Sequence, residues 1–304
     1  MTNKEEKIYK FINERRGYVK KHPYTIQNVL YKQTNKIYKE EEIRKALNQL
    51  KNDIKTETYK ESTKKEQKYK TKNIQVIPSI KNLDKDNVIA IADTHFPFCK
   101  PNYLEFCLEV QRKYRCGTVI HIGDEVDNCA ISQWEKDPDG FSAGSEADLA
   151  QKDMEAWYKA FPEVRVCIGN HTARPFRMAR TMGIPKKFVK TYEEAWNAPK
   201  GWRWADHWEY NGTLYTHGTG FSGANAALRI ATRHRQNTVI GHIHSEAGVQ
   251  FNASKIDLIW GMQLGGALDD KTYAAYYAKD QLKKSIVGCG VILGNTPIYI
   301  PMAL

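Results

Sequence analysis

Short apolar runs alternate with segments of helical spacing along the chain after residue 86. The apolar runs are 88–92, 118–122 and 164–168, and the helical segments lie near 102–115, 145–161 and 221–235. Runs of this length suit buried strands, and strands that alternate with helices indicate a sheet covered by helices. We therefore predict that residues 87–304 form one α/β domain.

The chain ends in an uncharged stretch, 285–304, that is long enough to cross a membrane. It is interrupted by several glycines and by Pro297 and Pro301, which suit strands and turns better than a spanning helix. We predict two short strands joined by a turn at Gly294 and Asn295, and we expect no membrane partner. The charged amino end also lacks the apolar core of a secretory signal.

Three helical patterns precede the α/β domain. Their apolar positions are Ile8, Phe11 and Ile12; Ile26, Val29 and Leu30; and Ile43, Ala46, Leu47 and Leu50. Three short helices with a brief polar turn between the last two are typical of a helix-turn-helix. The segments 54–62 and 64–72, which are basic when taken together, alternate roughly by twos, as the strands of a wing hairpin do. We predict a winged-helix-like α(+β) domain over 1–72 and a linker over 73–86.

Positive charge is concentrated in the same amino-terminal part. The chain has 46 Lys and Arg against 35 Asp and Glu, a formal net charge of +11. Residues 1–85 hold 22 of the basic and 11 of the acidic side chains, so the whole surplus lies there. This asymmetry is typical of a nucleic-acid partner, and DNA is our preferred candidate. A small helical bundle with solvated lysines explains the charge equally well.

The six cysteines form no Cys-x-x-Cys pair and no dense framework. Reduced thiols in a cytoplasmic setting are therefore expected. We expect these cysteines to be unreactive packing residues.

The apolar runs 88–92, 118–122 and 164–168 and the shorter runs 213–216 and 238–240 each end in side chains of the types that bind metal ions. These side chains are Asp93, His95, Asp124, Asn170, His217, His242 and His244, with His171 beside them. In an α/β sheet the groups of a site gather outside the carboxyl ends of the strands, so we expect these donors at one rim. Residues two apart point the same way while the backbone is extended, which lets both donors of Asp-x-His or His-x-His reach one ion. Gly123, Gly169 and Gly241 remove side-chain bulk where the backbone turns beneath the ions.

The donors are carboxylate, amide and imidazole groups without a thiolate. Such a set selects divalent ions such as manganese, iron or zinc, of which we expect manganese. Two dications would face only two carboxylates, those of Asp93 and Asp124. The surplus positive charge would attract a phosphate and a hydroxide.

The motifs D-x-H, G-D-x-x-D, G-N-H, H and G-H-x-H follow one another in this order. Together they resemble the calcineurin-like metallophosphoesterase superfamily over about Val88 to His244. The resemblance implies a four-layer α/β/β/α sandwich with two divalent metal ions that activate a water for attack on phosphorus. One ion would be bound by Asp93, His95, Asp124 and His244, and the second by Asp124, Asn170, His217 and His242. His171 would protonate the leaving oxygen.

Two positions depart from the family pattern. Many members place Asp or Glu directly after G-N-H, where this chain has Thr172, so the group that orients His171 is left open. Asn128 stands where the protein-phosphatase branch has a basic residue after G-D-x-x-D, which weakens a protein-phosphatase activity.

Arginines recur every three residues after the G-N-H motif. Arg174, Arg177 and Arg180 share a helical face that begins at the rim, and arginine binds phosphate bidentately. We predict that Arg174 and Arg177 bind the substrate phosphate. An exposed basic face is the alternative.

Other polar residues near the motifs suit structural roles better. Asp127 is expected to cap a turn or to hold a metal-binding side chain in place, and His121 is expected in the core. Surface positions are expected for Glu125, His207 and His234. The tryptophans Trp202, Trp204 and Trp208 are expected to pack, with base stacking as the alternative.

A basic module joined to a dinuclear metal site predicts a nucleic-acid phosphodiesterase, that is, a nuclease. The phrase DTHFPF at 93–98 adds a looser resemblance to phage-encoded phosphoesterases, whose setting would be the host cytoplasm. One alternative is a phosphomonoesterase, protein phosphatase or small-nucleotide phosphodiesterase with a tethering amino end. The other is a DNA-binding regulator with an inactive phosphoesterase domain, against which the intact donor set argues.

Overall fold

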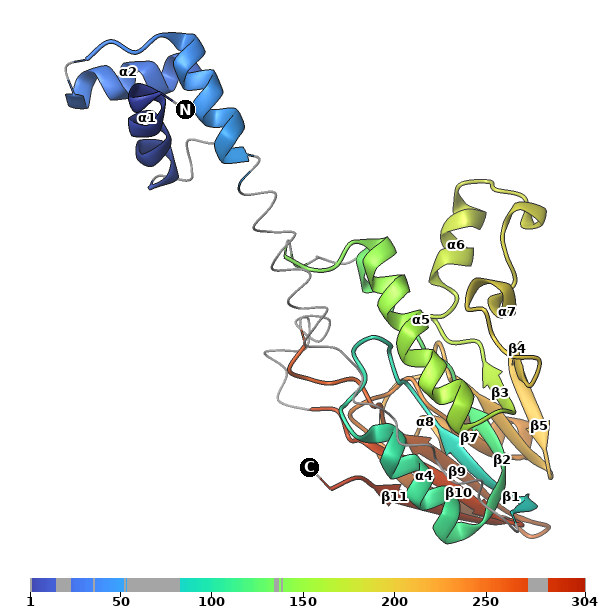
Figure 1. Cartoon of the computed structure of the whole chain (residues 1–304). Helices are drawn as coiled ribbons and strands as arrows, with labels where there is room; N and C mark the ends of the chain where they lie inside the picture. The colour runs from blue at the N-terminus through green and yellow to red at the C-terminus, as the bar shows by residue number, and fades with distance from the viewer. Residues whose placement is uncertain are drawn as a thin grey trace. The chain divides into compact units, whose positions relative to one another are not determined.

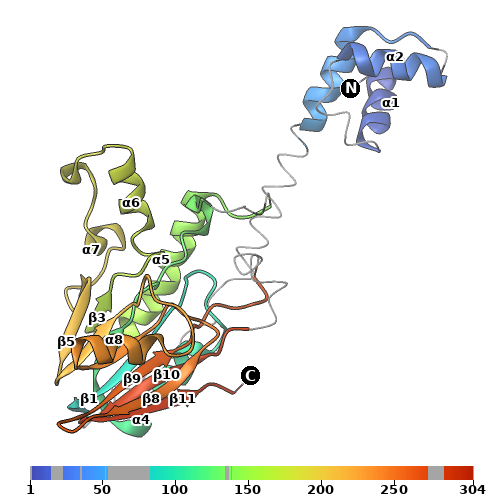
Figure 2. The same cartoon turned by 180° about the vertical axis from the view of Figure 1, so that it is seen from behind.

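The computed structural model describes residues 2–14, 23–34, 36–51, 53, 83–133, 137, 139–272 and 284–303 (Figure 1 and, from behind, Figure 2). The contacts between residues divide the chain into Met1–Lys72 and Asn73–Leu304. Each of these units has its own hydrophobic core.

The amino-terminal unit contains the predicted helices α1 (Asn3–Asn13), α2 (Pro23–Thr34) and a helical stretch over 40–51. α1 begins at a capping box, in which Thr2 and Glu5 each accept from the other's backbone amide. The helices pack around Ile8, Ile12, Ile26, Leu30, Tyr38, Ile43, Ala46, Leu47 and Leu50. The segments predicted as a wing, 54–62 and 64–72, lie outside the described residues, so the winged-helix-like domain stays a prediction.

The carboxyl-terminal unit is built on two sheets, and the first has the strand order β11-β10-β1-β2-β3-β4. The strands are β1 (Asp84–Ile91), β2 (Cys116–His121), β3 (Val164–Cys167), β4 (Trp202–Ala205), β10 (Gly288–Leu293) and β11 (Thr296–Pro301). β1 to β4 run parallel, and β10 and β11 form the predicted antiparallel pair around the turn at Gly294 and Asn295. β1 begins inside the segment predicted as linker, because Asp84 pairs with Cys116 of β2.

The second sheet has the strand order β5-β6-β7-β9-β8. Its strands are β5 (His207–Tyr210), β6 (Thr213–Thr216), β7 (Asn237–Ile240), β8 (Ala247–Ala253) and β9 (Leu258–Leu264). β6, β7 and β9 run parallel, whereas β5 and β8 are antiparallel to their neighbours. Both sheets therefore have parallel strands whose carboxyl ends open into the loops that carry the motifs.

Helices cover the outer faces of both sheets. α4 (Tyr103–Tyr114) and α5 (Ala143–Ala160) pack on the first sheet, and α8 (Ala226–His234) packs on the second. Alternate side chains of β1 show the layering, because Ile89 and Ile91 join the core beneath the helices while Val88 and Ala90 join the core between the sheets. The result is the predicted four-layer α/β/β/α sandwich (Figure 1).

Shorter elements connect these layers. They are the 3-10 turns η2 (Cys129–Ile131) and η3 (Lys186–Phe188) and the helices α6 (Arg174–Thr181) and α7 (Tyr192–Ala195). In the part of the chain that the structure describes, no helix is both long and apolar enough to span a membrane. The cysteines are free thiols in buried or half-buried positions.

α8 and β9 approach each other closely at Gly261. A Cβ atom on Gly261 would lie 2.3 Å from the Leu228 amide nitrogen and 2.4 Å from the Ala227 carbonyl carbon. Gly261→Ala should therefore push the helix off the sheet and lower the free energy of unfolding by about 1–3 kcal/mol. Gly144→Ala is the matched control, since a Cβ there meets nothing within 4 Å. Urea denaturation followed by circular dichroism measures both variants, and equal stabilities would contradict the close approach.

Candidate metal centre

The motif residues converge at one rim, where strands of both sheets end. Asp93 and His95 follow β1, Asp124 follows β2, Asn170 follows β3, His217 follows β6, and His242 and His244 follow β7. All the predicted metal ligands are thereby brought together, although they come from both sheets. His171 lies beside them, with its ring centroid 4.7 Å from that of His95.

The first donor group consists of Asp93, His95 and His244. One ligand atom from each lies within 4.8 Å of the other two. His244 Nε2 is 3.2 Å from His95 Nε2 and 3.3 Å from Asp93 Oδ1. Ligands at about 2 Å from an ion are about 3 Å apart, so these separations suit one coordination shell.

The second donor group consists of Asp124, His217 and His242, again within 4.8 Å. His217 Nε2 lies 3.0 Å from Asp124 Oδ2 and 3.0 Å from Asn170 Oδ1, so the Asn170 amide oxygen belongs to this group. The structure thus brings together the residues of the ligand sets that the family resemblance implies, and their binding of metal stays a prediction. The structure places Asp124 in the second group, and its bridging role between two ions stays a prediction.

Hydrogen bonds behind the donors orient two of the rings. His95 Nδ1 lies 2.8 Å from Asp127 Oδ2, and His217 Nδ1 lies 2.9 Å from the Ile122 carbonyl oxygen. Because a carboxylate and a carbonyl only accept, each Nδ1 carries a proton, and in the neutral ring each Nε2 presents its lone pair to a donor group. Oriented imidazole, carboxylate and amide donors of this kind fit divalent metal ions.

The buried carboxylates and imidazoles shift one another's pKa values. Burial opposes protonation of His95, but its hydrogen bonds to Asp127 and Asp93 outweigh that effect and raise its pKa to about 10. Burial opposes protonation of His217 as well, but Asp124 raises its pKa to about 9. Burial also disfavours the Asp93 carboxylate, yet hydrogen bonds from His244 and His95 hold its pKa well below the usual range. A divalent ion therefore has to displace protons from this rim when it binds.

The backbone is strained where the donors leave their strands. φ is 54° at Asp93, 49° at His95, 51° at Asp124 and 67° at His242, in the left-handed region that residues other than glycine seldom adopt. Strain of this kind gathers at functional sites, where the surrounding structure maintains it. The fold, and not the local preference of these residues, therefore holds the donors in place.

Two glycines lie directly against the carboxylates. A Cβ atom on Gly241 would lie 2.2 Å from Asp93 Oδ2, and one on Gly169 would lie 2.1 Å from Asp124 Oδ1. The amide that follows Gly241 also donates to both Asp93 oxygens, at 3.1 and 3.0 Å. The motif glycines thus leave the room that the sequence predicted for the donors.

His171 is oriented by the loop that follows β2. Its Nδ1 lies 2.8 Å from the carbonyl oxygen of Asp127, and Asn128 Nδ2 donates to the His171 carbonyl at 3.0 Å. Nδ1 therefore carries a proton, and Nε2 is the atom through which the ring exchanges one. The side chain is 18% exposed, against 1% for His95, so it can reach a bound substrate. The main-chain carbonyl of Asp127 thus orients His171, the role for which Thr172 offers no acid after G-N-H.

Arg174 and Arg177, predicted to bind the substrate phosphate, donate to the main chain of the site. Arg174 Nη1 donates to the carbonyls of Asp127 and Asn128 at 3.0 and 2.7 Å, and Arg177 Nη2 donates to that of Asn170 at 2.9 Å. A guanidinium has five N–H donors, so these bonds leave others for a phosphate. Binding of substrate by these arginines stays a prediction, and the structure adds that both hold loops of the rim.

The expectation that Glu125 lies at the surface is wrong. Its buried carboxylate accepts from Thr172 Oγ1 at 2.6 Å and from Trp204 Nε1 at 3.0 Å, and burial raises its pKa to about 7. Thr172 Oγ1 also accepts from the Asp124 amide at 3.1 Å. Glu125 and Thr172 therefore support Asp124 from behind. The sequence held one indication of this contact. Thr172 stands where many family members have an acid, and Glu125, from the loop after β2, brings a buried carboxylate to Thr172.

Other candidates lie in the packed interior. His121 is buried with its Nε2 3.1 Å from Thr94 Oγ1, and burial lowers its pKa to about 4, so it is a neutral core residue, as expected. Trp202 Nε1 donates to the Phe161 carbonyl at 2.8 Å, and Trp208 donates to a carbonyl of β3. The tryptophans thus pack the strands together.

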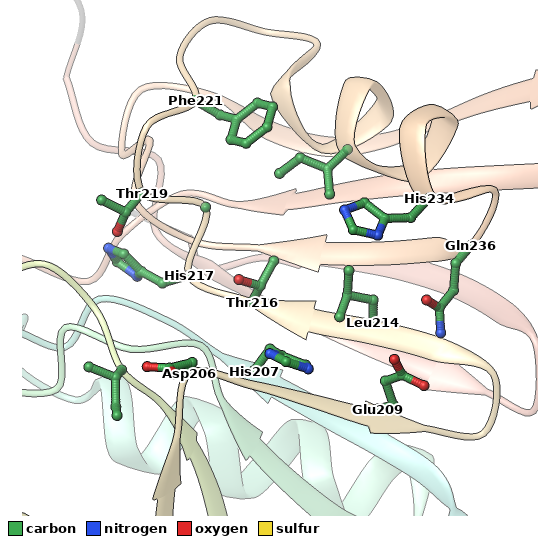
Figure 3. A pocket seen from close by; sticks show the side chains of 13 residues that line it. Asp206, His207, Glu209, Leu214, Thr216, His217, Thr219, Phe221, His234 and Gln236 are labelled. Carbon is green, nitrogen blue, oxygen red and sulfur yellow. The ribbon is translucent and has the colours of Figure 1, made fainter.

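A hollow of about 340 Å³ lies on the outer side of the second sheet, between β5, β6 and α8 (Figure 3). His207 and His234, which are exposed as expected, line it. In Figure 3, His217 and Thr219 lie at one end of the hollow and Gln236 at the other. Because His217 also belongs to the second donor group, the hollow reaches the edge of the metal centre.

Substitution of Asp127 should weaken metal binding while the chain still folds. Asp127→Asn removes the charged acceptor behind His95 and should weaken Mn²⁺ binding by about 10–100-fold. Asp139→Asn is the matched control at an exposed position. Calorimetric titration with Mn²⁺ measures both variants, and equal affinities would show that Asp127 does not support the metal centre.

Comparisons with known proteins give weak similarities. No family model matches the chain. The Gene 54 protein of Mycobacterium phage L5 is 23% identical over 217 residues, which cover 60% of this chain and 80% of that protein.

Several solved structures have a similar arrangement over 71% of this chain. An archaeal phosphodiesterase is 14% identical with a TM-score of 0.38, and 99% of its chain is covered. Vacuolar protein sorting 29 from Cryptosporidium parvum is 13% identical with a TM-score of 0.33 and 96% coverage, and the nuclease MPE from Pseudomonas putida is 12% identical with a TM-score of 0.29 and 88% coverage.

The strand order and the donor positions of the chain itself define its fold. The motifs follow the family's order, and the layers are α/β/β/α. The predicted donors lie in two of the three groups of potential metal ligands at the rim, and the third group is His95, Asp127 and His171. The carboxyl-terminal unit of this chain therefore has the α/β/β/α arrangement that the resemblance to calcineurin-like metallophosphoesterases implies.

Proposed function

We propose that the chain is a metal-dependent phosphoric ester hydrolase that cleaves phosphodiester bonds. The observation that carries this proposal is the meeting of two donor groups, Asp93–His95–His244 and Asp124–His217–His242, at one rim. Two adjacent groups of this composition suit two divalent ions, for which we propose manganese. When bound, such ions polarise a phosphoryl group and make water a nucleophile at neutral pH.

The charge of the rim supports an anionic substrate. Asp93 and Asp124 are the two carboxylates in these two donor groups, and the remaining donors are an amide and imidazoles, which are neutral when they bind a metal ion. Two dications on two carboxylates leave surplus positive charge, which a phosphodiester anion balances. Arg174 and Arg177 lie beside the same loops and add to this charge.

His171 is suited to deliver a proton to the leaving oxygen. Its Nδ1 is bonded to the Asp127 carbonyl, so proton exchange takes place at Nε2 on the opposite side of the ring. The ring lies edge-on to that of His95, so the proton is delivered next to the first donor group. A protonated Nε2 gives its proton to the departing alkoxide and is restored from solvent, since the side chain is partly exposed.

A nucleic acid is the substrate that we propose. The amino-terminal segment 1–85 carries the whole surplus of positive charge, and its described helices have a core of their own. A separate basic unit joined to a phosphodiesterase suits a polyanion better than a small ester. Retention of the complete donor set argues against a DNA-binding regulator with an inactive domain.

The test is hydrolysis by the purified full chain with Mn²⁺. Substrates are labelled DNA, labelled RNA, bis(p-nitrophenyl) phosphate as a simple diester and p-nitrophenyl phosphate as a monoester. Cleavage of the simple diester and of a nucleic acid supports the proposal. Cleavage of the monoester alone would favour a phosphomonoesterase, and cleavage of small esters without any nucleic acid would eliminate the nuclease.

His171 and Asp124 should differ in what their substitution removes. Asp124→Asn should abolish hydrolysis and weaken metal binding, because it takes a carboxylate from the donor set. His171→Ala should retain the metals and slow turnover by about 10²–10⁴-fold, because it removes the proton donor. Steady-state kinetics and metal analysis measure both effects, with His234→Ala as the surface control. A His171→Ala protein without metal would show that the ring holds an ion instead.

DNA binding by residues 1–85 alone should depend steeply on salt. Lysines and arginines that neutralise phosphates release counterions, so affinity should fall by at least about tenfold between about 50 and 200 mM salt. Fluorescence anisotropy with labelled DNA measures this, with sucrose added at matched osmolarity as the control. Binding that does not respond to salt would contradict a contact through charge.

A further inference from the structure

The segment 174–190 has a charge unlike that of the rest of its unit. It contains six basic residues and no acidic one, whereas residues 86–304 as a whole hold equal numbers of basic and acidic side chains. The basic residues are Arg174, Arg177, Arg180, Lys186, Lys187 and Lys190. One local stretch of the otherwise balanced unit is therefore strongly positive.

The same segment exposes large apolar side chains. Phe188 is 70% exposed and Met182 is 76% exposed, and Met178 and Ile184 are nearly half exposed. Figure 1 shows α6 and the loop after it extending away from the two sheets. Lys187 Nζ lies 5.0 Å from the centroid of the Phe188 ring, so a cation and an aromatic face are presented together. We call residues 174–190 the basic projection.

The basic projection is anchored at both ends. At the start, Arg174 and Arg177 donate to carbonyls of the loops that carry the metal donors. Phe176, near the start, packs on Tyr192, just past the end, with ring centroids 4.1 Å apart. Just past the end, α7 also begins at a capping box on Thr191. The backbone that carries the cations is therefore held to the rest of the unit at both ends, which lowers the entropy that the segment loses when it binds a partner.

The cations of the basic projection begin at the metal centre and extend to the far end of α6, beyond the reach of a small ester. α6 starts directly after the G-N-H loop, and at about 1.5 Å per residue its eight residues span about 12 Å. Lys186, Lys187 and Lys190 follow that helix. These lysines lie on the stretch that returns from the far end of α6 toward Tyr192, which packs on Phe176. Together with Arg180 they suit the further phosphates of a chain that leaves the rim.

We propose that the basic projection binds a single strand of nucleic acid as it leads into the metal centre. The proposal rests on the proposed phosphodiesterase and adds where and in what form the polymer is held. Lysines and arginines contact successive phosphates, and the exposed Phe188 ring stacks on an unpaired base, whose face a duplex would hide. An anionic membrane surface has the same charge, but the cations continue into the rim that receives the phosphodiester, which favours the strand.

The experiment measures binding of the full chain to a labelled single-stranded oligonucleotide by fluorescence anisotropy, with EDTA present so that the strand is not cut. The triple substitution Lys186→Ala, Lys187→Ala, Lys190→Ala should weaken binding at least about tenfold and reduce the slope of log Kd against log salt by about 2. Phe188→Ala should weaken binding at least about fivefold through loss of stacking.

Two matched controls correct for charge and for exposed apolar area. The charge control is a second triple substitution, Lys113→Ala, Lys159→Ala, Lys255→Ala, which removes the same charge from exposed positions elsewhere. The control for apolar area is Phe251→Ala, which removes another ring that is 56% exposed. Both controls should bind the strand within about twofold of the unchanged chain.

Equal binding by each test variant and its control would overturn the proposal. It would also be overturned if the substitutions released the chain from vesicles of phosphatidylglycerol and phosphatidylcholine and left strand binding unaltered. These outcomes differ from failure of the proposed function, which is read from the unchanged chain with Mn²⁺ as an inability to hydrolyse any phosphodiester.

Discussion

The close contact between two carboxylates and two glycines is the constraint on which the metal centre depends. Asp93 lies against Gly241 and Asp124 lies against Gly169, each so closely that a single methyl group would overlap a carboxylate oxygen. In each pair the carboxylate and the glycine come from loops of different strands. The loops can approach only because the strands beneath them end at the same edge, so the sandwich is the cause of the site's geometry.

The layering of the sandwich explains how so many polar groups can be buried together. Apolar side chains of β1 alternate between the core beneath the helices and the core between the sheets, and the polar residues begin only where the strand ends. Each buried donor then finds a partner in a neighbouring loop, as His95 does in Asp127. The hydrophobic interior ends where the metal-donor side chains begin, and the residues with left-handed backbone lie at that boundary.

Much of the fold and of the donor set could be predicted from the sequence because both depend on local patterns. Strands 88–92 and 118–122 show as apolar runs, and a donor that follows such a run belongs at the rim whatever the rest of the chain does. Glu125 could not be placed in this way. Its burial depends on Thr172 and Trp204, which lie far along the chain, and no local pattern reports such partners. The start of β1 at Asp84 was missed for the same reason, since pairing with β2 extends it.

One carbonyl oxygen, that of Asp127, accepts from both the His171 ring and the Arg174 guanidinium. Arg174 is the first residue of α6, and the ring is the group that we assign to proton delivery. A displacement of this helix therefore alters the electrostatic environment of the imidazole through a single shared acceptor. The position of the outer helix and the hydrogen bonding of the inner ring are linked by this one oxygen atom.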